Sequence, residues 1–315
     1  MDQLAPLPPR LDPRKFRDPA LTARGEPRAV VAPGRLQTLW FNTGSLCNLA
    51  CATCYMESSP RDHRLAYLTA AEVSRYLDEA AGLGTDLVGF TGGEPLLNPD
   101  LPAMLADVLA RGWRALVLTN AMAPLRKQRA RLLPLLAHGN RLTFRVSLDH
   151  YTAEGHEAER GRRSWAPAIA GLRWLAEHGF AVHVASRLTA GEPALALRAG
   201  FAALFVRLGL RIDADDPAEL VLFPQMDATA DVPEITTACW DILGRKPADL
   251  MCASARMVLR RQEADAPAVV ACTLLPYEPA FELGGTLAES LRPVALNHPH
   301  CARFCMLGGA ACSRG

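Results

Sequence analysis

Three cysteines lie within one short stretch, "SLCNLACATCYMESSP", which spans residues 45–60. Cys47, Cys51 and Cys54 follow a CxxxCxxC spacing, which brings three sulfurs to one side of a loop, and thiolates suit iron–sulfur clusters, zinc and copper(I). A structural metal site usually has four protein ligands, and this stretch supplies three. The spacing therefore favours a metal centre with one open position. The alternative is a zinc site completed by a distant residue such as His63.

A second group of cysteines lies near the end of the chain, and eight of the nine cysteines belong to one of the two groups. In a reducing compartment, such groups indicate metal binding or redox chemistry rather than a disulfide framework. His298 and His300 are competing candidate ligands beside the second group. We expect Cys239, which stands apart, to be a buried apolar thiol. The second group consists of Cys252, Cys272, Cys301, Cys305 and Cys312.

The elements that must position these residues alternate between short apolar strands and amphipathic helices. The pattern predicts strands over 36–43, 85–94, 114–120, 141–149, 181–189 and 218–225. It predicts helices over 68–84, 101–112, 125–139, 165–179 and 193–209, the first with Thr69 as its N-cap. Such alternation is typical of an α/β fold with parallel strands buried on both faces, either a barrel or an open sheet.

Polar motifs follow these strands at the point where each strand ends. The cysteine triplet follows the first strand and "TGGEP", residues 91–95, follows the second. Asn120 ends the third strand, "SLD" (147–149) ends the fourth, and Arg187 ends the fifth. Because the loops after the carboxyl ends of parallel strands build the site in such folds, we expect all these motifs on one rim.

The two ends of the chain differ from this middle part. Residues 1–35 are rich in proline, which predicts an extended arm without regular helix. After about residue 245 the alternation stops, and residues 252–275 are typical of two strands joined by a turn. We therefore divide the chain into an arm (1–35), an α/β body (36–245) and a small cysteine-rich extension (246–315).

Composition excludes several classes of protein. Among the 315 residues, 34 Lys and Arg balance 33 Asp and Glu, which is not the electrostatic footprint of a nucleic-acid partner. No apolar run approaches the roughly 18 residues of a membrane span, and the N-terminus lacks the apolar core of a signal peptide. We expect a cytoplasmic protein that contacts neither nucleic acid nor membrane.

The segment "CNLACATC" resembles the cluster-binding motif of the radical S-adenosylmethionine (radical SAM) superfamily. The resemblance implies a partial (β/α)6 barrel and a [4Fe-4S] cluster held by three cysteines, whose open iron binds the methionine part of SAM. One departure is Thr53, because the residue before the third cysteine is usually aromatic in that family. Tyr55 is then expected to contact the adenine.

"TGGEP" resembles the second signature of that family, whose glycine and glutamate positions receive the amino group of SAM. Strand-end polar residues meet the ribose and carboxylate of SAM in relatives. "HEAERG", residues 156–161, resembles an HDxxRG stretch of the branch that matures sulfatases and modifies peptides. The SAM contacts implied by the resemblance, besides Tyr55, are Gly92, Gly93, Glu94, Asn120, Ser147, Asp149 and Arg187.

The C-terminal cysteines resemble, in outline, the auxiliary-cluster extension called SPASM, or its shorter twitch form. In that extension a hairpin carries two cysteines and a later pair closes the site. The resemblance implies one auxiliary [4Fe-4S] cluster held by Cys252, Cys272, Cys301 and Cys305, with Cys312 as the substitute. A zinc site is the alternative there.

The resemblance also implies a reaction. The reduced cluster, supplied by a flavodoxin- or ferredoxin-type electron donor, cleaves SAM to a 5′-deoxyadenosyl radical that abstracts a hydrogen atom from a substrate. The expected substrate is a peptide or protein side chain, and an auxiliary cluster that accepted an electron would make the net reaction an oxidation. The alternatives are a small-molecule dehydrogenase or rearranging enzyme, and a non-catalytic zinc or iron–sulfur protein.

Overall fold

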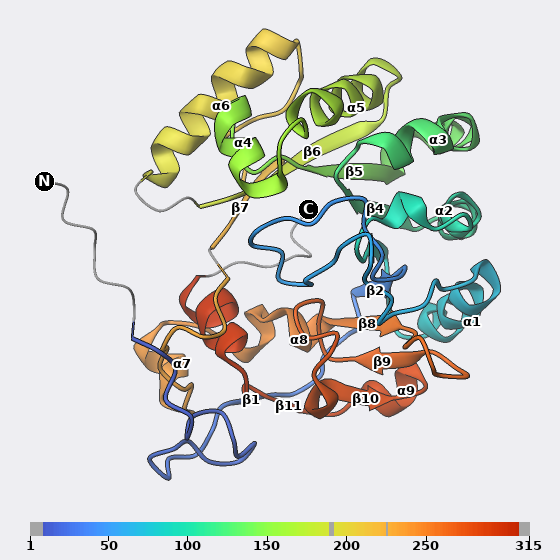
Figure 1. Ribbon diagram of the computed structural model, residues 1–315. Coiled ribbons are helices and arrows are strands. Elements are labelled where there is room, and N and C mark those ends of the chain that lie inside the picture. Colours follow the sequence, from blue (N-terminus) through green and yellow to red (C-terminus); the bar gives the residue numbers. More distant parts are fainter. Residues whose placement is uncertain (1–8, 189–191, 225, 309–315) are drawn as a thin grey trace, which may run out of the picture.

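A nine-stranded sheet organises the computed structural model, which describes residues 9–188, 192–224 and 226–308 (Figure 1). The strand order is β10-β9-β8-β2-β3-β4-β5-β6-β7, and β1 pairs with β11 in a separate two-stranded sheet. The strands are β1 (Val30–Val31), β2 (Thr38–Asn42), β3 (Leu87–Thr91), β4 (Arg114–Thr119), β5 (Leu142–Ser147), β6 (Ala181–Arg187), β7 (Leu220–Phe223), β8 (Ala255–Leu259), β9 (Ala268–Val270), β10 (Glu282–Gly284) and β11 (Val294–Ala295).

The six strands predicted from the sequence are all present, as β2 to β7, and each pairs in parallel with the next. The predicted C-terminal hairpin is also present, as the antiparallel pair β8 and β9. The sequence pattern did not show that β8 is a seventh parallel strand, which pairs with β2 along Thr38↔Ala255 to Phe41↔Val258. The main sheet therefore continues across residue 245, and the division of the chain there stays a prediction.

Helices connect the parallel strands and lie along the outer side of the sheet (Figure 1). Thr69 caps α1 as predicted, in a reciprocal capping box with Glu72. The helices are α1 (Ala70–Ala81), α2 (Leu101–Ala110), α3 (Ala123–Leu132), α4 (Ala153–Arg160), α5 (Trp165–Glu177), α6 (Ala194–Leu208), α7 (Cys239–Ile242), α8 (Met251–Ser254) and α9 (Leu287–Ser290).

Shorter turns of 3₁₀ and π geometry complete the chain. The predicted helix over 125–139 is wrong in its second half, where the chain continues from α3 as a 3₁₀ segment and Gly139 adopts a left-handed conformation. The 3₁₀ segments are η1 (Pro95–Leu97), η2 (Leu133–Arg141), η3 (Pro247–Asp249) and η4 (Pro279–Phe281), and η5 (Cys301–Leu307) is a π-helix.

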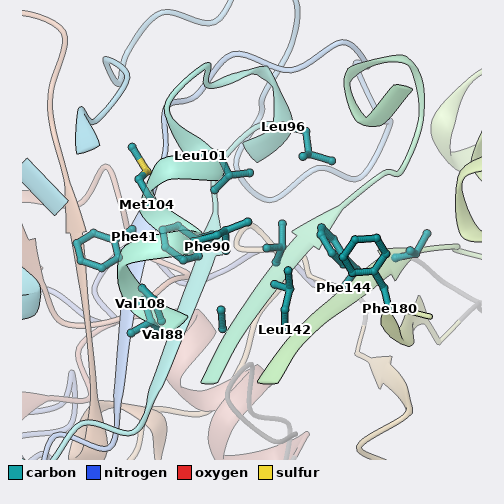
Figure 2. Packing of buried hydrophobic residues seen from close by; sticks show 14 of the residues in the cluster. Phe41, Val88, Phe90, Leu96, Leu101, Met104, Val108, Leu142, Phe144 and Phe180 are labelled. Carbon is teal, nitrogen blue, oxygen red and sulfur yellow. The ribbon is translucent and has the colours of Figure 1, made fainter. Parts of the chain in front are cut away.

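Two hydrophobic clusters lie on the two faces of the sheet because successive strand side chains point in opposite directions. On β2, Phe41 joins the cluster under the outer helices, while Trp40 joins the cluster on the other face. Figure 2 shows the first cluster, in which Phe41 stacks on Phe90 at a centroid distance of 5.7 Å and Leu101 and Met104 of α2 lie nearby. The second cluster includes residues of β8, β9 and η5.

The described part of the N-terminal arm, residues 9–35, contains no helix, as the proline content predicted. It pairs with later segments of the chain, through β11 and through isolated bridges to Ala230 and Thr236. Val30 and Val31 pair with β11. The side chains of Arg28 and Glu234 form a 2.6 Å ion pair that is almost fully buried. Among the described residues, no helix has both the length and the apolar character needed to cross a membrane.

Candidate active site

A cavity of about 150 Å³ opens at the carboxyl ends of the parallel strands. The motifs that follow strands β2 to β6 all contribute side chains or backbone to its wall, so the expected single rim is present in the structure. The sequence-predicted residues that line it are Cys47, Cys51, Cys54, Tyr55, Gly92, Gly93, Asn120, Ser147, Asp149 and Arg187. Arg160 and Ser186 line it too, and neither was among the predicted SAM contacts.

The cysteine loop brings three thiols together on one side of this cavity. Cys47 is buried, while Cys51 and Cys54 are half-buried. Burial raises the pKa of Cys47 to about 12, and the nearby Glu94, Cys51 and Cys54 contribute to the shift. The pKa of Cys51 is also raised, first by burial. These thiols need a cationic partner to ionise, which is the environment that a metal centre supplies.

The "TGGE" turn packs directly against the start of the cysteine loop. The Gly93 amide donates to the Gly44 carbonyl at 2.9 Å, and the Glu94 amide donates to the Leu46 carbonyl at 3.0 Å. A side chain at Gly93 would collide with the carbonyl oxygens of Ser45 and Leu46. The glycines therefore permit a close approach to the chain itself, in addition to any approach to a ligand.

Glu94 is buried and is not one of the residues that line the described part of the cavity. Its carboxylate accepts hydrogen bonds from the Thr119 hydroxyl at 2.7 Å, the Asn120 amide at 2.8 Å and the Leu96 amide at 3.1 Å. Burial raises its pKa and these donors oppose the shift. In this structure Glu94 fastens the turn after β3 to the end of β4, and its contact with a SAM amino group stays a prediction.

Asn120 connects the end of β4 to the cysteine loop. Its Nδ2 donates to the side-chain oxygen Oδ1 of Asn48 at 2.9 Å, and its own Oδ1 accepts from the Met122 backbone amide at 3.1 Å. Asn48 lies between the first two cysteines of the motif. Asn120 thus lines the cavity and also holds the loop that carries the thiols.

Asp149 lies between two arginines in the cavity wall. Its Oδ2 accepts from Arg160 Nε at 2.7 Å, and its Oδ1 lies 3.4 Å from Arg187 Nε. Burial favours the neutral acid, but Arg160 and Arg187 outweigh it and the pKa of Asp149 is lowered. The Ser186 hydroxyl donates to the Asp149 carbonyl at 3.0 Å. In this structure Asp149 therefore orders the arginines of the wall, and its contact with SAM stays a prediction.

Arg160 comes from the "HEAERG" stretch, which forms most of α4. The strand and helix pattern missed this helix because it is short and has a single fully buried residue, His156. The His156 ring packs edge-on against Trp165, and burial lowers its pKa to about 4. Neither ring nitrogen has a hydrogen-bond partner among the described residues. His156 is a neutral core residue, and Arg160 is the member of the motif that reaches the cavity.

The remaining wall is apolar and comes largely from the C-terminal half of the chain. Phe223, at the end of β7, stacks on Phe304 of η5 at a centroid distance of 5.6 Å. Leu274 and Met226 extend this wall. No sequence motif pointed to these residues, because their neighbours are set by the way the C-terminal segment folds over the sheet.

The C-terminal cysteines belong to the second hydrophobic cluster, which also contains Leu274 and Phe304 of the cavity wall. Cys252 and Cys301 are buried, and Cys272 and Cys305 are half-buried. Burial raises the pKa of Cys252 to about 11 and that of Cys301 well above its usual value, with Cys272 and Cys252 adding to the second shift. Cys301 therefore lies near both Cys252 and Cys272. Cys312 lies outside the described residues.

Other candidate ligands lie apart from these groups or beside them. His63 is exposed on the surface. Burial lowers the pKa values of His298 and His300 to about 4, so both rings are neutral near Cys301. Cys239 is half-buried rather than buried, which corrects the expectation for that thiol. Within the described residues, no three Cys, His, Asp or Glu side chains are close enough to enclose a single metal ion.

Comparison with known proteins shows which proteins this chain is similar to. Residues 41–192 match the model of the Radical SAM superfamily. The "Antilisterial bacteriocin subtilosin biosynthesis protein AlbA" of Bacillus subtilis (strain 168) is 32% identical over 146 residues, which are 46% of this chain and 32% of that protein. "Mycofactocin maturase MftC" of Mycobacterium ulcerans (strain Agy99) is 33% identical over 135 residues, 43% of this chain and 35% of that protein.

A relative named for a small molecule matches equally well. "GTP 3',8-cyclase 1" of Mycobacterium tuberculosis (strain ATCC 25618 / H37Rv) is 34% identical over 145 residues, 42% of this chain and 38% of that protein. This chain thus spans about a third of the length of the curated relatives it matches.

Among solved structures, Streptococcus suis SuiB bound to S-adenosylmethionine superposes with a TM-score of 0.59 at 12% identity. The match covers 81% of this chain and 63% of SuiB. SuiB bound to its precursor peptide SuiA gives a TM-score of 0.50 at 17% identity, over 63% of this chain and 40% of SuiB. At such identities the likeness shows the fold alone, and the predicted α/β partial barrel is confirmed.

Proposed function

We propose that this chain is a radical SAM enzyme, since the model of that superfamily matches residues 41–192, and that Cys47, Cys51 and Cys54 hold its [4Fe-4S] cluster. When bound, the cluster and SAM together supply a 5′-deoxyadenosyl radical that abstracts a hydrogen atom from a substrate. The observation that carries the proposal is the wall of three thiols in one cavity with the polar residues that end strands β3 to β6. Thiol donors suit iron–sulfur chemistry, so the residues present fit the group.

The other residues of the cavity have separate tasks in this proposal. Arg160 and Arg187 both pair with Asp149, at 2.7 Å and 3.4 Å, and Arg187 is the cation that we assign to the SAM carboxylate. Tyr55 offers a ring for the adenine from the cysteine loop, and Ser147 and Asn120 offer hydrogen bonds to the ribose. The apolar wall around Phe223 and Phe304 keeps water from the reacting carbon.

A peptide or protein side chain is the substrate class that we favour. Two relatives support it by name, a bacteriocin biosynthesis protein and a mycofactocin maturase. The "HEAERG" stretch supports it too, because Arg160 of this stretch lies in the cavity wall. The second candidate is a small-molecule reaction, which the equally similar GTP 3',8-cyclase favours.

An auxiliary cluster would extend the chemistry. Cys252, Cys272, Cys301 and Cys305 share one hydrophobic cluster, and we assign them to a second [4Fe-4S] centre. Such a centre would take an electron from the product radical and make the reaction an oxidation. A flavodoxin- or ferredoxin-type protein is the proposed donor to the first cluster, and a cytoplasmic location stays a prediction.

The test is anaerobic reconstitution of the full chain with iron and sulfide, followed by reduction in the presence of SAM. We expect two clusters per chain and formation of 5′-deoxyadenosine. If the reconstituted protein formed no 5′-deoxyadenosine, the result would favour the remaining alternative, a non-catalytic iron–sulfur or zinc protein. A mass change in a small peptide encoded beside the gene would favour the peptide substrate, and an unchanged peptide would favour the small-molecule reaction.

A further inference from the structure

Helix α4 holds the short segment between the second and third cysteines of the loop through one residue, Glu159. The Thr53 hydroxyl donates to Glu159 Oε2 at 2.7 Å. The Ala52 amide donates to the Glu159 carbonyl at 2.9 Å. Thr53 and Ala52 are the two residues that separate Cys51 from Cys54, so both bonds act on the spacing of these thiols.

The same threonine is held from the opposite side by β6. Arg187 Nη1 donates to both the carbonyl and the hydroxyl oxygen of Thr53. A hydroxyl can donate once and also accept, and here it donates to Glu159 and accepts from Arg187. Thr53 is therefore fixed between α4 and β6, at the position where the family usually has an aromatic residue.

The charges around this contact alternate in sign. Glu159 and Arg187 both bind Thr53, Arg187 also pairs with Asp149, and Asp149 pairs with Arg160. Thr53 thus joins Glu159 to a chain of three charges, Arg187, Asp149 and Arg160, in which neighbouring charges are opposite. The chain links the cysteine loop to the cavity wall that carries Arg160 and Arg187.

The position of Glu159 in its helix is not explained by helix stability. It lies in the last turn of α4, next to Arg160, the final residue. A carboxylate at a helix C-terminus is disfavoured by the helix dipole. A residue that opposes its own helix, and that is bonded instead to the loop of a candidate cofactor, indicates a role in holding that loop.

We propose that Glu159 is a positioning residue for the cluster: through Thr53 it sets the conformation of the loop that presents Cys51 and Cys54. This inference rests on the proposed function. Glu159 acts through another residue and touches no reacting atom. It is a contact outside the ligand set, of the kind that typically changes metal affinity about 10- to 100-fold when it is removed.

The variants that test this role are Glu159→Ala, Glu159→Gln and Thr53→Val. Glu159→Ala removes the acceptor, and Thr53→Val removes the donor with little change in shape. Glu159→Gln keeps an acceptor oxygen, so it is expected to rescue the wild-type behaviour. Glu154→Ala is the matched control, because Glu154 is an exposed carboxylate in the first turn of the same helix.

The first readout is the loss of iron to a chelator from the reconstituted full chain. We expect Glu159→Ala and Thr53→Val to lose iron about tenfold faster than the wild type. Glu159→Gln and Glu154→Ala are expected to lose iron at the wild-type rate. The double variant Thr53→Val/Glu159→Ala is expected to be no worse than the poorer single variant, because both remove the same bond. The electron paramagnetic resonance signal of the reduced cluster should change in Glu159→Ala and Thr53→Val, but not in Glu159→Gln or Glu154→Ala.

The second readout needs no cluster. Amide hydrogen exchange of the peptide over 50–55 in the apo chain is expected to be faster in Glu159→Ala than in the wild type and Glu154→Ala. Equal exchange and equal iron retention in Glu159→Ala would overturn the inference, as would fully additive losses in the double variant. If the wild type itself bound no iron, the proposed function would fail, and the exchange data would still decide whether Glu159 orders the loop.

Discussion

The two cysteine groups of this protein are held in place by different physical means. The loop of Cys47, Cys51 and Cys54 is held by polar contacts, including Asn48 to Asn120 and Thr53 to Glu159. The C-terminal cysteines lie in an apolar cluster among residues of α8, β8 and η5. The first group lines a cavity whose wall has a charged part and an apolar part, and the second group lies within the apolar cluster, against which Cys54 also packs.

This difference suggests a division of tasks. Catalytic metal sites keep an open position, whereas structural and electron-transfer sites are closed by the protein. A cavity with arginines, hydroxyl groups and an amide can bind a polar ligand such as SAM at the first site. The apolar surroundings of the second site favour a centre with four thiol ligands and no exchangeable one. The following predictions test this comparison.

The largest expected effect comes from removing one thiol from each group. Cys47→Ala is expected to abolish 5′-deoxyadenosine formation and to lose about half of the iron, because a three-thiol site has no spare ligand. Cys272→Ala is expected to lose a similar amount of iron but to keep SAM cleavage. Iron and sulfide counts with a product assay measure both, and Cys239→Ala is the control. If Cys47→Ala kept all its iron, the assignment of the first site would be wrong.

The second prediction concerns Arg256, the buried cation beside the C-terminal thiols. Its guanidinium donates to the carbonyls of Cys252 at 2.6 Å, Ala255 at 2.7 Å and Ser290 at 3.0 Å. Burial lowers its pKa, and Cys252 and Cys272 oppose that shift. Arg256→Met leaves these carbonyls without their donor, and we expect the unfolding free energy to fall by about 3–5 kcal/mol.

Denaturant unfolding of the apo chain measures this loss. If the two cysteine groups are held independently, amide hydrogen exchange in Arg256→Met should become faster around residues 252 and 301–305. The loop over 47–54 should keep its wild-type protection. Equal loosening of both cysteine groups would show that they are not held independently.

The sequence predicted which motifs would meet at one rim because of a simple geometric rule. Carboxyl ends of parallel strands meet at one edge, so Asn120, Ser147 and Arg187, which end three different strands, had to approach the cysteine loop. The alternation of strands and helices was sufficient to apply that rule. The pattern could not place Arg160, because α4 is too short to show helical periodicity.

Other features depend on tertiary pairing that no local pattern carries. β8 is a parallel neighbour of β2 although more than 200 residues separate them, so the sequence suggested a separate hairpin. The pKa of Glu94 depends on hydrogen bonds from Thr119 and Asn120, at the end of the next strand. The apolar wall requires Phe223 and Phe304 to stack, which follows from the fold of the C-terminal segment.

A third prediction uses pH to separate the two regions. Since the pKa of Asp149 is lowered in the folded state, its contribution to stability is complete above about pH 4 and is lost as the pH falls through the folded-state value. Asp149→Asn is expected to cost about 2–3 kcal/mol at pH 7, because Arg160 and Arg187 lose a charged partner. The difference from the wild type should shrink below about pH 4.

Denaturant unfolding of the apo chain across this pH range provides the check. Arg256→Met should show a loss that is independent of pH between about 4 and 7, since its acceptors are backbone carbonyls that do not titrate. A constant difference for Asp149→Asn over the same range, extending below about pH 4, would contradict the charge-based account of the first region.

The smallest expected effect is on the affinity for SAM and concerns Tyr55. Its ring lines the cavity one residue after the third cysteine, and Thr53 leaves it as the aromatic candidate on that loop. Tyr55→Leu should weaken SAM binding by about 2- to 10-fold, the equivalent of a stacking contact, while Tyr55→Phe keeps the ring and should bind normally. Calorimetric titration of the reconstituted protein measures both. The iron content should not change in either variant. A loss of iron in Tyr55→Leu would mean that the ring supports the cysteine loop rather than the ligand. In that case Arg187, Asn120 and Ser147 would be the residues left to hold SAM in the cavity.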